Sequence, residues 1–211
     1  RPVHTSRQSN GVTSLGNHQH FMQKEIYEQP RAVADTLEGR LAGDRLFEEA
    51  FGPMSKKVLD RVQAVQIIAC GTSYHAALVA RHWLEYVGVP CNIDVASVLR
   101  YRRHALQKET LVVTFPQSRE TADTLAALEE TKKLGLRDSL TITNTPESSL
   151  VRESTLAFLT HAGPEIGVAS TKTFVASLTV LMLLSLALAR RHGYDEGFEA
   201  HIVSQLRALP A

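Results

Sequence analysis

Three loop segments place hydroxyl side chains at the predicted starts of helices, where a small anion can bind. Cys-Gly-Thr-Ser at 70–73 and Pro-Gln-Ser-Arg-Glu-Thr at 116–121 each follow a short apolar run. The third segment, residues 163–172, carries Ser170 and Thr171 at the start of a long apolar helix. A helix N-terminus offers unpaired N–H groups and a partial positive charge, so hydroxyls there can complete a shell around a phosphate. These loops therefore predict a phosphate ligand.

Helix capping is the competing interpretation of the same hydroxyls. Thr72, Ser73 and Ser118 could each only cap a helix, which contributes about 1 kcal/mol. Two such loops on neighbouring strands favour a binding site over two unrelated caps. The sequence contains neither G-x-x-x-x-G-K-S/T nor G-x-G-x-x-G, which are typical nucleotide-binding loops. A sugar phosphate therefore suits these loops better than a nucleotide.

The elements that would position these loops alternate between strand and helix. Residues 74–87 and 120–134 have the spacing of helices, and they lie between short apolar runs that are predicted strands. These runs do not alternate between apolar and polar residues as the strands of a half-exposed sheet do, which favours a parallel sheet covered on both faces. The predicted strands are 65–69, 91–95, 111–115, 140–143 and, more weakly, 155–159. We predict an α/β fold: three αβα layers with a five-stranded parallel, flavodoxin-like sheet of order 2-1-3-4-5.

That strand order gives the loops a functional position. The winding direction of the sheet reverses between its first and third strands, and open parallel sheets bind ligands at the carboxyl ends of strands beside such a reversal. Loops 70–73 and 116–121 follow those two strands. The sequence thus predicts one site formed by both loops.

Further helices are predicted on either side of the sheet region. Residues 21–41 have helical spacing, and Pro30 marks either a break or a new first turn within them. Short helices are expected around Phe47 and over 55–62. The uncharged segment 173–189 would form about 26 Å of helix, a little short of a membrane span. Because three hydroxyls interrupt it, we interpret it as a buried core helix; they are Ser177, Thr179 and Ser185.

Composition argues against several other classes of protein. Twenty-three Lys and Arg balance 22 Asp and Glu, for a net charge of +1, so neither nucleic acid nor a membrane is an expected partner. The basic run at 100–104 is interpreted as solvated surface. Cys70 and Cys91 form no C-x-x-C pair and the histidines form no cluster, so we expect free thiols and no metal. Residues 1–20 lack an apolar signal core, and we expect a cytoplasmic protein.

At the level of motifs, the chain resembles the glucosamine-6-phosphate synthase family, the glutamine–fructose-6-phosphate aminotransferases. The resemblance runs from residue 21 to about residue 210. It rests on five blocks that occur in the family's order: FMQKEIYEQP at 21–30, ACGTSY at 69–74, ETADT at 120–124, SSLVRE at 148–153 and EIGVASTK at 165–172. Several blocks in order are far more specific than a single loop.

The resemblance implies the first sugar-isomerase (SIS) domain of that family, which makes glucosamine 6-phosphate and glutamate from fructose 6-phosphate and glutamine in amino-sugar biosynthesis. It implies no cofactor and no metal. The domain would cover 21–211, with a helical extension at 21–62 after a linker at 1–20. The resemblance assigns the sugar phosphate to Thr72, Ser73, Gln117, Ser118 and Thr121, and the hydroxyl-bearing end of the sugar to Val168, Ala169 and Ser170.

Two departures from the family pattern fall in the central loop. The family typically has Ser-Gln-Ser-Gly-Glu-Thr where this chain has Pro116 and Arg119 in place of the first Ser and the Gly. Pro116 removes a hydroxyl and a backbone donor, and Arg119 replaces a flexible residue. Arg119 would either contact the phosphate through its guanidinium or obstruct the pocket.

The family's catalytic groups have no counterpart in this chain. The ring-opening His, the Schiff-base Lys and the acid/base Glu belong to the family's second SIS domain, and a cysteine nucleophile opens its glutaminase domain. We therefore assign no catalytic residue here and interpret the chain as part of a longer protein. Expected partners are fructose 6-phosphate or glucosamine 6-phosphate, the glutaminase and second SIS domains, and a second copy in a homodimer. A single-SIS sugar-phosphate sensor and a structural SIS domain with an impaired pocket stay open.

Overall fold

The computed structural model describes residues 14–99, 107–116 and 121–211. Its main sheet has five parallel strands in the order β4-β3-β5-β6-β7, which is 2-1-3-4-5 along the chain. The predicted sheet and its order are therefore confirmed. The strands lie within one residue of their predicted bounds: β3 (Ala64–Ile68), β4 (Cys91–Asp94), β5 (Thr110–Thr114), β6 (Ser139–Thr143) and β7 (Leu156–Leu159).

The central strands lie between two separate cores. Every residue of β3, β5 and β6 is buried, which explains why their sequences are apolar or β-branched without alternation. Ile67 and Val113 are paired across the register and join the larger core, whereas Ile68 and Val112 join the smaller one. Because successive side chains point to opposite faces, both faces of the sheet are covered.

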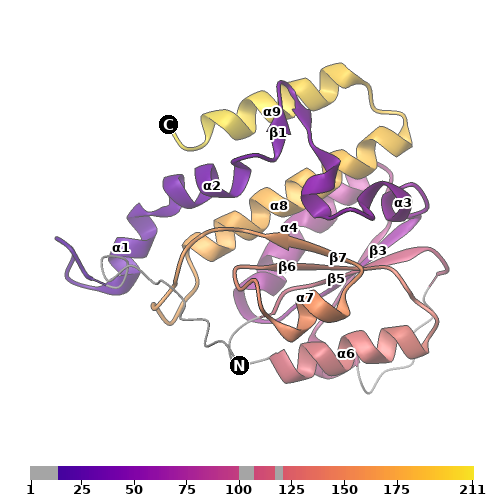
Figure 1. The fold of residues 1–211 in the computed structure, drawn as a ribbon, viewed down its shortest axis with the longest axis horizontal. Helices are drawn as coiled ribbons and strands as arrows, with labels where there is room; N and C mark the ends of the chain where they lie inside the picture. The colour runs from indigo at the N-terminus through magenta and orange to yellow at the C-terminus, as the bar shows by residue number, and fades with distance from the viewer. Residues whose placement is uncertain (1–13, 100–106, 117–120) are drawn as a thin grey trace, which may run out of the picture.

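Helices cover each face, as the three-layer prediction requires. Figure 1 shows α4 and α8 on one side of the sheet and α6 on the other. In α8, 13 of 18 residues are buried. By length and composition the segment Lys172–His192 could cross a membrane, but 72% of its most apolar window is buried inside this fold, as expected for a core helix. The covering helices are α4 (Gly71–Tyr86), α5 (Ala96–Leu99), α6 (Thr121–Lys133), α7 (Ser149–Glu153) and α8 (Lys172–Ala189).

The segment before the sheet differs in part from its prediction. The interruption expected at Pro30 is confirmed: the segment forms two helices, α1 (Phe21–Tyr27) and α2 (Gln29–Leu37), and Pro30 lies in the first turn of α2, where its missing N–H costs no hydrogen bond. The end of the predicted helix was wrong. There the chain forms a hairpin of β1 (Leu41–Ala42) and β2 (Arg45–Leu46), and Gly43 takes a positive φ of 58° in its turn.

Short elements complete the chain. Residues around Phe47 form the 3-10 helix η1 (Glu48–Phe51), and α3 (Ser55–Leu59) ends three residues before the predicted bound of 62. The C-terminal elements η2 (Arg190–His192) and α9 (Glu196–Ala208) had no prediction.

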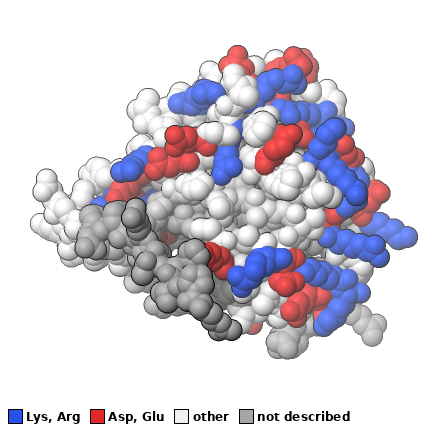
Figure 2. Space-filling model, viewed as in Figure 1, with Lys and Arg blue, Asp and Glu red and all other residues white. Residues whose placement is uncertain are grey.

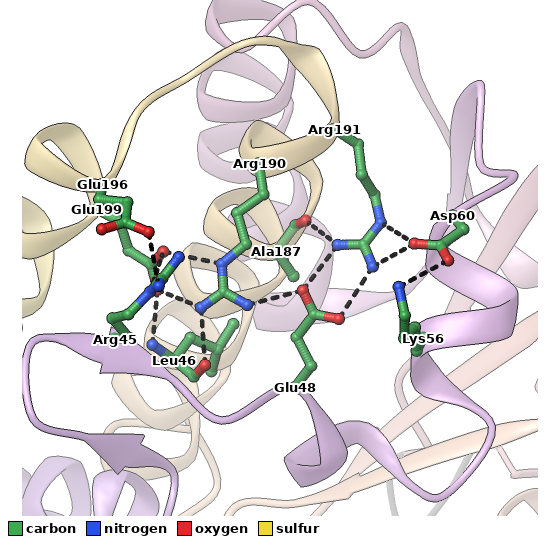
Figure 3. A network of polar contacts seen from close by, with 10 residues as sticks. All are labelled: Arg45, Leu46, Glu48, Lys56, Asp60, Ala187, Arg190, Arg191, Glu196 and Glu199. Carbon is green, nitrogen blue, oxygen red and sulfur yellow. Dashed lines mark hydrogen bonds and ion pairs between the residues drawn. The ribbon is translucent and has the colours of Figure 1, made fainter.

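A polar network fastens these outer elements together (Figure 3). Arg190 donates to Glu199 and Glu48, and Arg191 donates to Glu48 and Asp60, at distances of 2.6 to 2.9 Å. The network therefore joins η1 and α3 to the end of α8 and to α9. Elsewhere on the face drawn in Figure 2, basic and acidic side chains are interspersed, in keeping with a net charge of +1.

Candidate functional site

A cavity of about 530 Å³ lies at the carboxyl ends of β3, β5, β6 and β7. This is the end of the sheet at which the strand order predicts a ligand. Residues from all three hydroxyl-bearing loops line it. Of the predicted site residues, those that line the cavity are Thr72, Ser73, Pro116, Val168, Ala169 and Ser170.

The loop after β3 contributes the start of α4 to this cavity. Gly71 has a φ of 55°, a conformation that glycine adopts without steric cost, and it turns the chain from the strand into the helix. The N-cap residue, Cys70, makes no side-chain capping hydrogen bond. Thr72 and Ser73 therefore lie in the first turn of a 16-residue helix whose N-terminus faces a polar cavity and favours an anion.

The loop between β7 and α8 is built around Glu165. Its carboxylate accepts hydrogen bonds from the Thr171 amide at 2.8 Å, the Thr173 amide at 3.3 Å and the Ser170 hydroxyl at 2.8 Å. Glu165 thus caps α8, and the Ser170 hydroxyl donates to the same carboxylate. Because a carboxylate already occupies the start of α8, the start of α4 is the better position for a phosphate.

Polar residues after β6 form a wall that the sequence analysis missed. Thr143, Asn144, Thr145 and Thr160 all line the cavity. The Thr160 hydroxyl donates to Asn144 Oδ1 at 3.2 Å, and Asn144 Nδ2 donates to the Gly163 carbonyl at 2.5 Å. The signal was available, because a run of Thr and Asn at the end of a buried parallel strand indicates the ligand-binding edge of the sheet.

The charge of the cavity follows from these residues. Glu165 is the one charged residue among the described residues that line it. A phosphate would therefore rely on backbone N–H groups and hydroxyls, or on residues of the 117–120 segment. Gln117, Ser118 and Arg119 and the Thr121 side chain lie outside the described residues, so their predicted roles stay predictions.

Two other features of the described residues bear on the choice of site. A second cavity of about 530 Å³ is mostly apolar, with Ile26, Val33, Trp83 and Met182 among its lining residues, and offers no comparable set of phosphate ligands. Within the described ranges, no group of three or more His, Cys, Asp or Glu residues could hold a metal ion.

Comparison with known proteins identifies the family. Residues 59–187 match the SIS domain. The chain is 55% identical over 197 residues to a glutamine–fructose-6-phosphate aminotransferase (isomerizing) of Pseudomonas syringae pv. tomato, covering 92% of this chain and 32% of that protein. The protein of the same name from Idiomarina loihiensis is 52% identical over 211 residues, which cover 100% of this chain and 35% of that protein. The chain thus spans about a third of the length of the curated relatives it matches.

Solved structures agree with this assignment. The C-terminal domain of glucosamine-fructose-6-phosphate aminotransferase from Francisella tularensis superposes with a TM-score of 0.88 at 41% identity, over 92% of this chain and 55% of that one. The glucosamine-6-phosphate deaminase of Thermotoga maritima shares the fold, with a TM-score of 0.61 at 22% identity, over 88% of this chain and 53% of that one. With the parallel sheet, the cavity and the sequence match in agreement, the chain belongs to the SIS domain family.

Proposed function

We propose that this chain is the sugar-phosphate-binding half of the isomerase part of a glutamine–fructose-6-phosphate aminotransferase. The observation that carries the proposal is the cavity at the carboxyl ends of the strands, where residues from three separate loops meet. High identity to enzymes of that name over nearly the whole chain supports it.

The proposed binding mode follows the polarity of the cavity. The phosphate would lie against the first turn of α4, with Thr72 and Ser73 beside the helix N-terminus. The sugar would extend toward Val168, Ala169 and Ser170 on the opposite loop. Fixed donors at both ends would orient an open-chain sugar for chemistry performed by groups supplied elsewhere.

The proposal includes no acid/base catalyst in this chain. Glu165, the charged residue of the described lining, accepts hydrogen bonds from Ser170, Thr171 and Thr173 at the start of α8, so we assign it a role in the fold. We therefore expect no conversion of fructose 6-phosphate to glucose 6-phosphate or glucosamine 6-phosphate by the chain alone. Turnover that survives stringent repurification would contradict this assignment.

The remaining partners belong to the same proposal. In the longer protein, a glutaminase domain would deliver ammonia from glutamine and a second SIS domain would supply the catalytic groups. We also propose a cytoplasmic homodimer, for which light scattering at high concentration is the test.

One observation favours an alternative function, that of a structural SIS domain with an impaired pocket. Pro116 lines the cavity and has no N–H to donate. Under this alternative the fold and assembly would persist without measurable sugar-phosphate binding.

Calorimetric titration separates the two functions. Fructose 6-phosphate and glucosamine 6-phosphate should each give saturable binding to the 211-residue chain, whereas fructose should not. Thr72→Ala should weaken binding, because it removes a hydroxyl at the phosphate end of the cavity. Ser204→Ala, which removes an exposed hydroxyl from α9, is the matched control and should change nothing. Absence of saturable binding to the unmodified chain would favour the structural alternative.

A further inference from the structure

A buried carboxylate on α1 holds the loop that walls the cavity. Glu25 is 2% exposed, and its Oε1 accepts the Ile166 amide at 2.5 Å and the Gly167 amide at 3.1 Å. Its Oε2 accepts the Gly167 amide as well, at 3.1 Å. Figure 1 shows α1 beside the chain that leads from β7 to α8. A charged acceptor that is closed to water holds its donors strongly, so Glu25 ties this part of the loop to α1.

The fit between α1 and the loop depends on the missing side chain of Gly167. A Cβ at that position would collide with Glu25 Oε2 and lie 3.4 Å from Met22 Cα. The φ of Gly167 lies outside the left-handed region, so the backbone conformation does not itself require glycine. The Glu25 carboxylate is therefore the group that a side chain at position 167 would displace.

Two further contacts fasten the ends of the same loop to the same helix pair. The Thr36 hydroxyl of α2 donates to the Thr160 carbonyl, and Lys172 Nζ lies 2.7 Å from Glu28 Oε2. The Lys172 side chain is only 5% exposed. Burial disfavours the charged form of Glu28, but hydrogen bonds and charge from Lys172 and Lys24 outweigh it and lower the Glu28 pKa.

The position of these contacts gives them a functional meaning. The SIS domain match begins at residue 59, so α1 and α2 lie outside it. The loop that they hold supplies Gly167, Val168, Ala169 and Ser170 to the cavity. We infer that Glu25 is a positioning residue for the sugar-binding wall, and that docking of α1 and binding of the sugar are coupled through it. The inference rests on the proposed function.

Coupling of this kind is reciprocal. If docked α1 raises the affinity for the sugar phosphate, the bound sugar phosphate must stabilise docked α1 by the same factor. A contact that serves only the stability of the fold would not make exchange of the α1 amides depend on ligand in this way.

The first experiment compares Glu25→Ala and Glu25→Gln with Asp35→Asn in calorimetric titrations of the 211-residue chain. Asp35 pairs with Arg31 on an outer face of α2, so its variant removes a carboxylate from the same helix pair without touching the loop. Glu25→Ala should weaken fructose 6-phosphate binding by roughly 5-fold to 150-fold, the usual range of coupling between sites. Glu25→Gln should have a smaller effect because it retains an acceptor, and Asp35→Asn should have none.

Inorganic phosphate distinguishes positioning from general destabilisation. The loop held by Glu25 faces the sugar end of the proposed binding mode, and Thr72 and Ser73 face the phosphate end. Glu25→Ala should therefore leave inorganic phosphate binding, followed by amide shifts at millimolar concentration, within about 2-fold of the unmodified chain. Equal losses for both ligands would overturn the positioning role.

The second experiment approaches the contact from the loop. Gly167→Ala should weaken sugar binding in the unmodified background and do so less in Glu25→Ala, where the carboxylate no longer collides with the new Cβ. Additive effects of the two substitutions would overturn the inference. This double-mutant cycle stays informative if either single variant is less stable, because circular dichroism identifies the folded variants to be compared.

Hydrogen exchange provides the direct readout. Saturating fructose 6-phosphate should slow exchange of the α1 amides in the unmodified chain and not in Glu25→Ala. Two results would overturn the Glu25 inference alone. One is saturable binding of fructose 6-phosphate without protection of the α1 amides, and the other is equal affinity for fructose 6-phosphate in the unmodified chain and Glu25→Ala. Absence of saturable binding to the unmodified chain would instead overturn the proposed function on which it rests.

Discussion

Arg190 and Glu199 form a two-point ion pair, with Nε–Oε2 and Nη2–Oε1 distances of 2.8 and 2.6 Å. The Glu199 side chain is 3% exposed, and its Oε1 also accepts the Leu46 amide at 2.6 Å. The pair thus joins the end of α8, the start of α9 and the hairpin (Figure 3), and its carboxylate is the more buried partner, since the Arg190 side chain is 24% exposed.

Removing this carboxylate should destabilise the protein. Glu199→Ala leaves the Arg190 guanidinium and the Leu46 amide short of an acceptor, and breaking a buried pair typically costs about 3 to 5 kcal/mol. Because Arg190 keeps Glu48, we expect the lower end of that range in urea unfolding. Glu196→Ala is the matched control, since Glu196 is 77% exposed and should contribute less than about 1 kcal/mol. Equal effects of the two substitutions would contradict the buried role of Glu199.

The same network should make stability fall in acid. Burial raises the pKa of Glu199 and Glu48, but hydrogen bonds and charge from Arg190 and Arg191 outweigh it, so both lie below the usual 4.5. A lowered carboxyl pKa contributes stability that is complete above the unfolded value and is lost as pH falls through the folded value. The stability difference between the unmodified chain and Glu199→Gln should therefore shrink below about pH 4.5. If the free energy of unfolding falls equally with pH in both proteins, the Glu199 carboxylate is not the source of the acid sensitivity.

Cys91 should be inert toward thiol reagents. Burial raises the pKa of its thiol to about 12, and the side chain is 4% exposed. In Cys70→Ser, where Cys91 is the remaining cysteine, iodoacetamide at pH 8 should modify the folded chain far more slowly than the urea-unfolded chain, because the thiolate is the reactive form. Similar rates by mass spectrometry would show an accessible thiolate.

Reverting the central loop toward the family pattern should strengthen sugar-phosphate binding. Pro116→Ser with Arg119→Gly restores a donor and a hydroxyl, which together amount to about 1 to 3 kcal/mol or roughly 5-fold to 150-fold in affinity. If Arg119 contacts the phosphate, Arg119→Gly alone weakens binding; if Arg119 obstructs the pocket, the same change improves it. If calorimetric titration shows unchanged affinity after either reversion and after Ser118→Ala, the phosphate does not bind at this loop.

The sheet was predictable because its central strands are buried on both faces. Such strands must be apolar along their whole length, and the runs that contain Ile67 and Val113 could hardly belong to another element. The hairpin at 41–46 escaped prediction because each of its strands is two residues long and a turn glycine is its main signal. Helix α9 could have been found, since Asp195 caps it through the Phe198 amide and its apolar residues recur at helical spacing.

The cavity was predictable where its residues lie at the start of helices. Thr72 and Ser73 were recognised because they follow a predicted strand and begin a predicted helix beside the reversal of the winding direction. Glu25 could not be recognised in this way. Its role depends on a contact with Gly167, which lies 142 residues further along the chain. The residues around Glu25 in the sequence do not indicate such a contact.

The polar network can form only late in the synthesis of the chain. Glu48 meets Arg190 and Arg191 only after 142 or 143 further residues have been added. At about 5 to 20 residues per second, translation takes roughly 7 to 30 s to cover that distance. The hairpin and η1 therefore leave the ribosome long before their partners exist, and in that interval their acidic and apolar side chains remain open to chaperones and proteases.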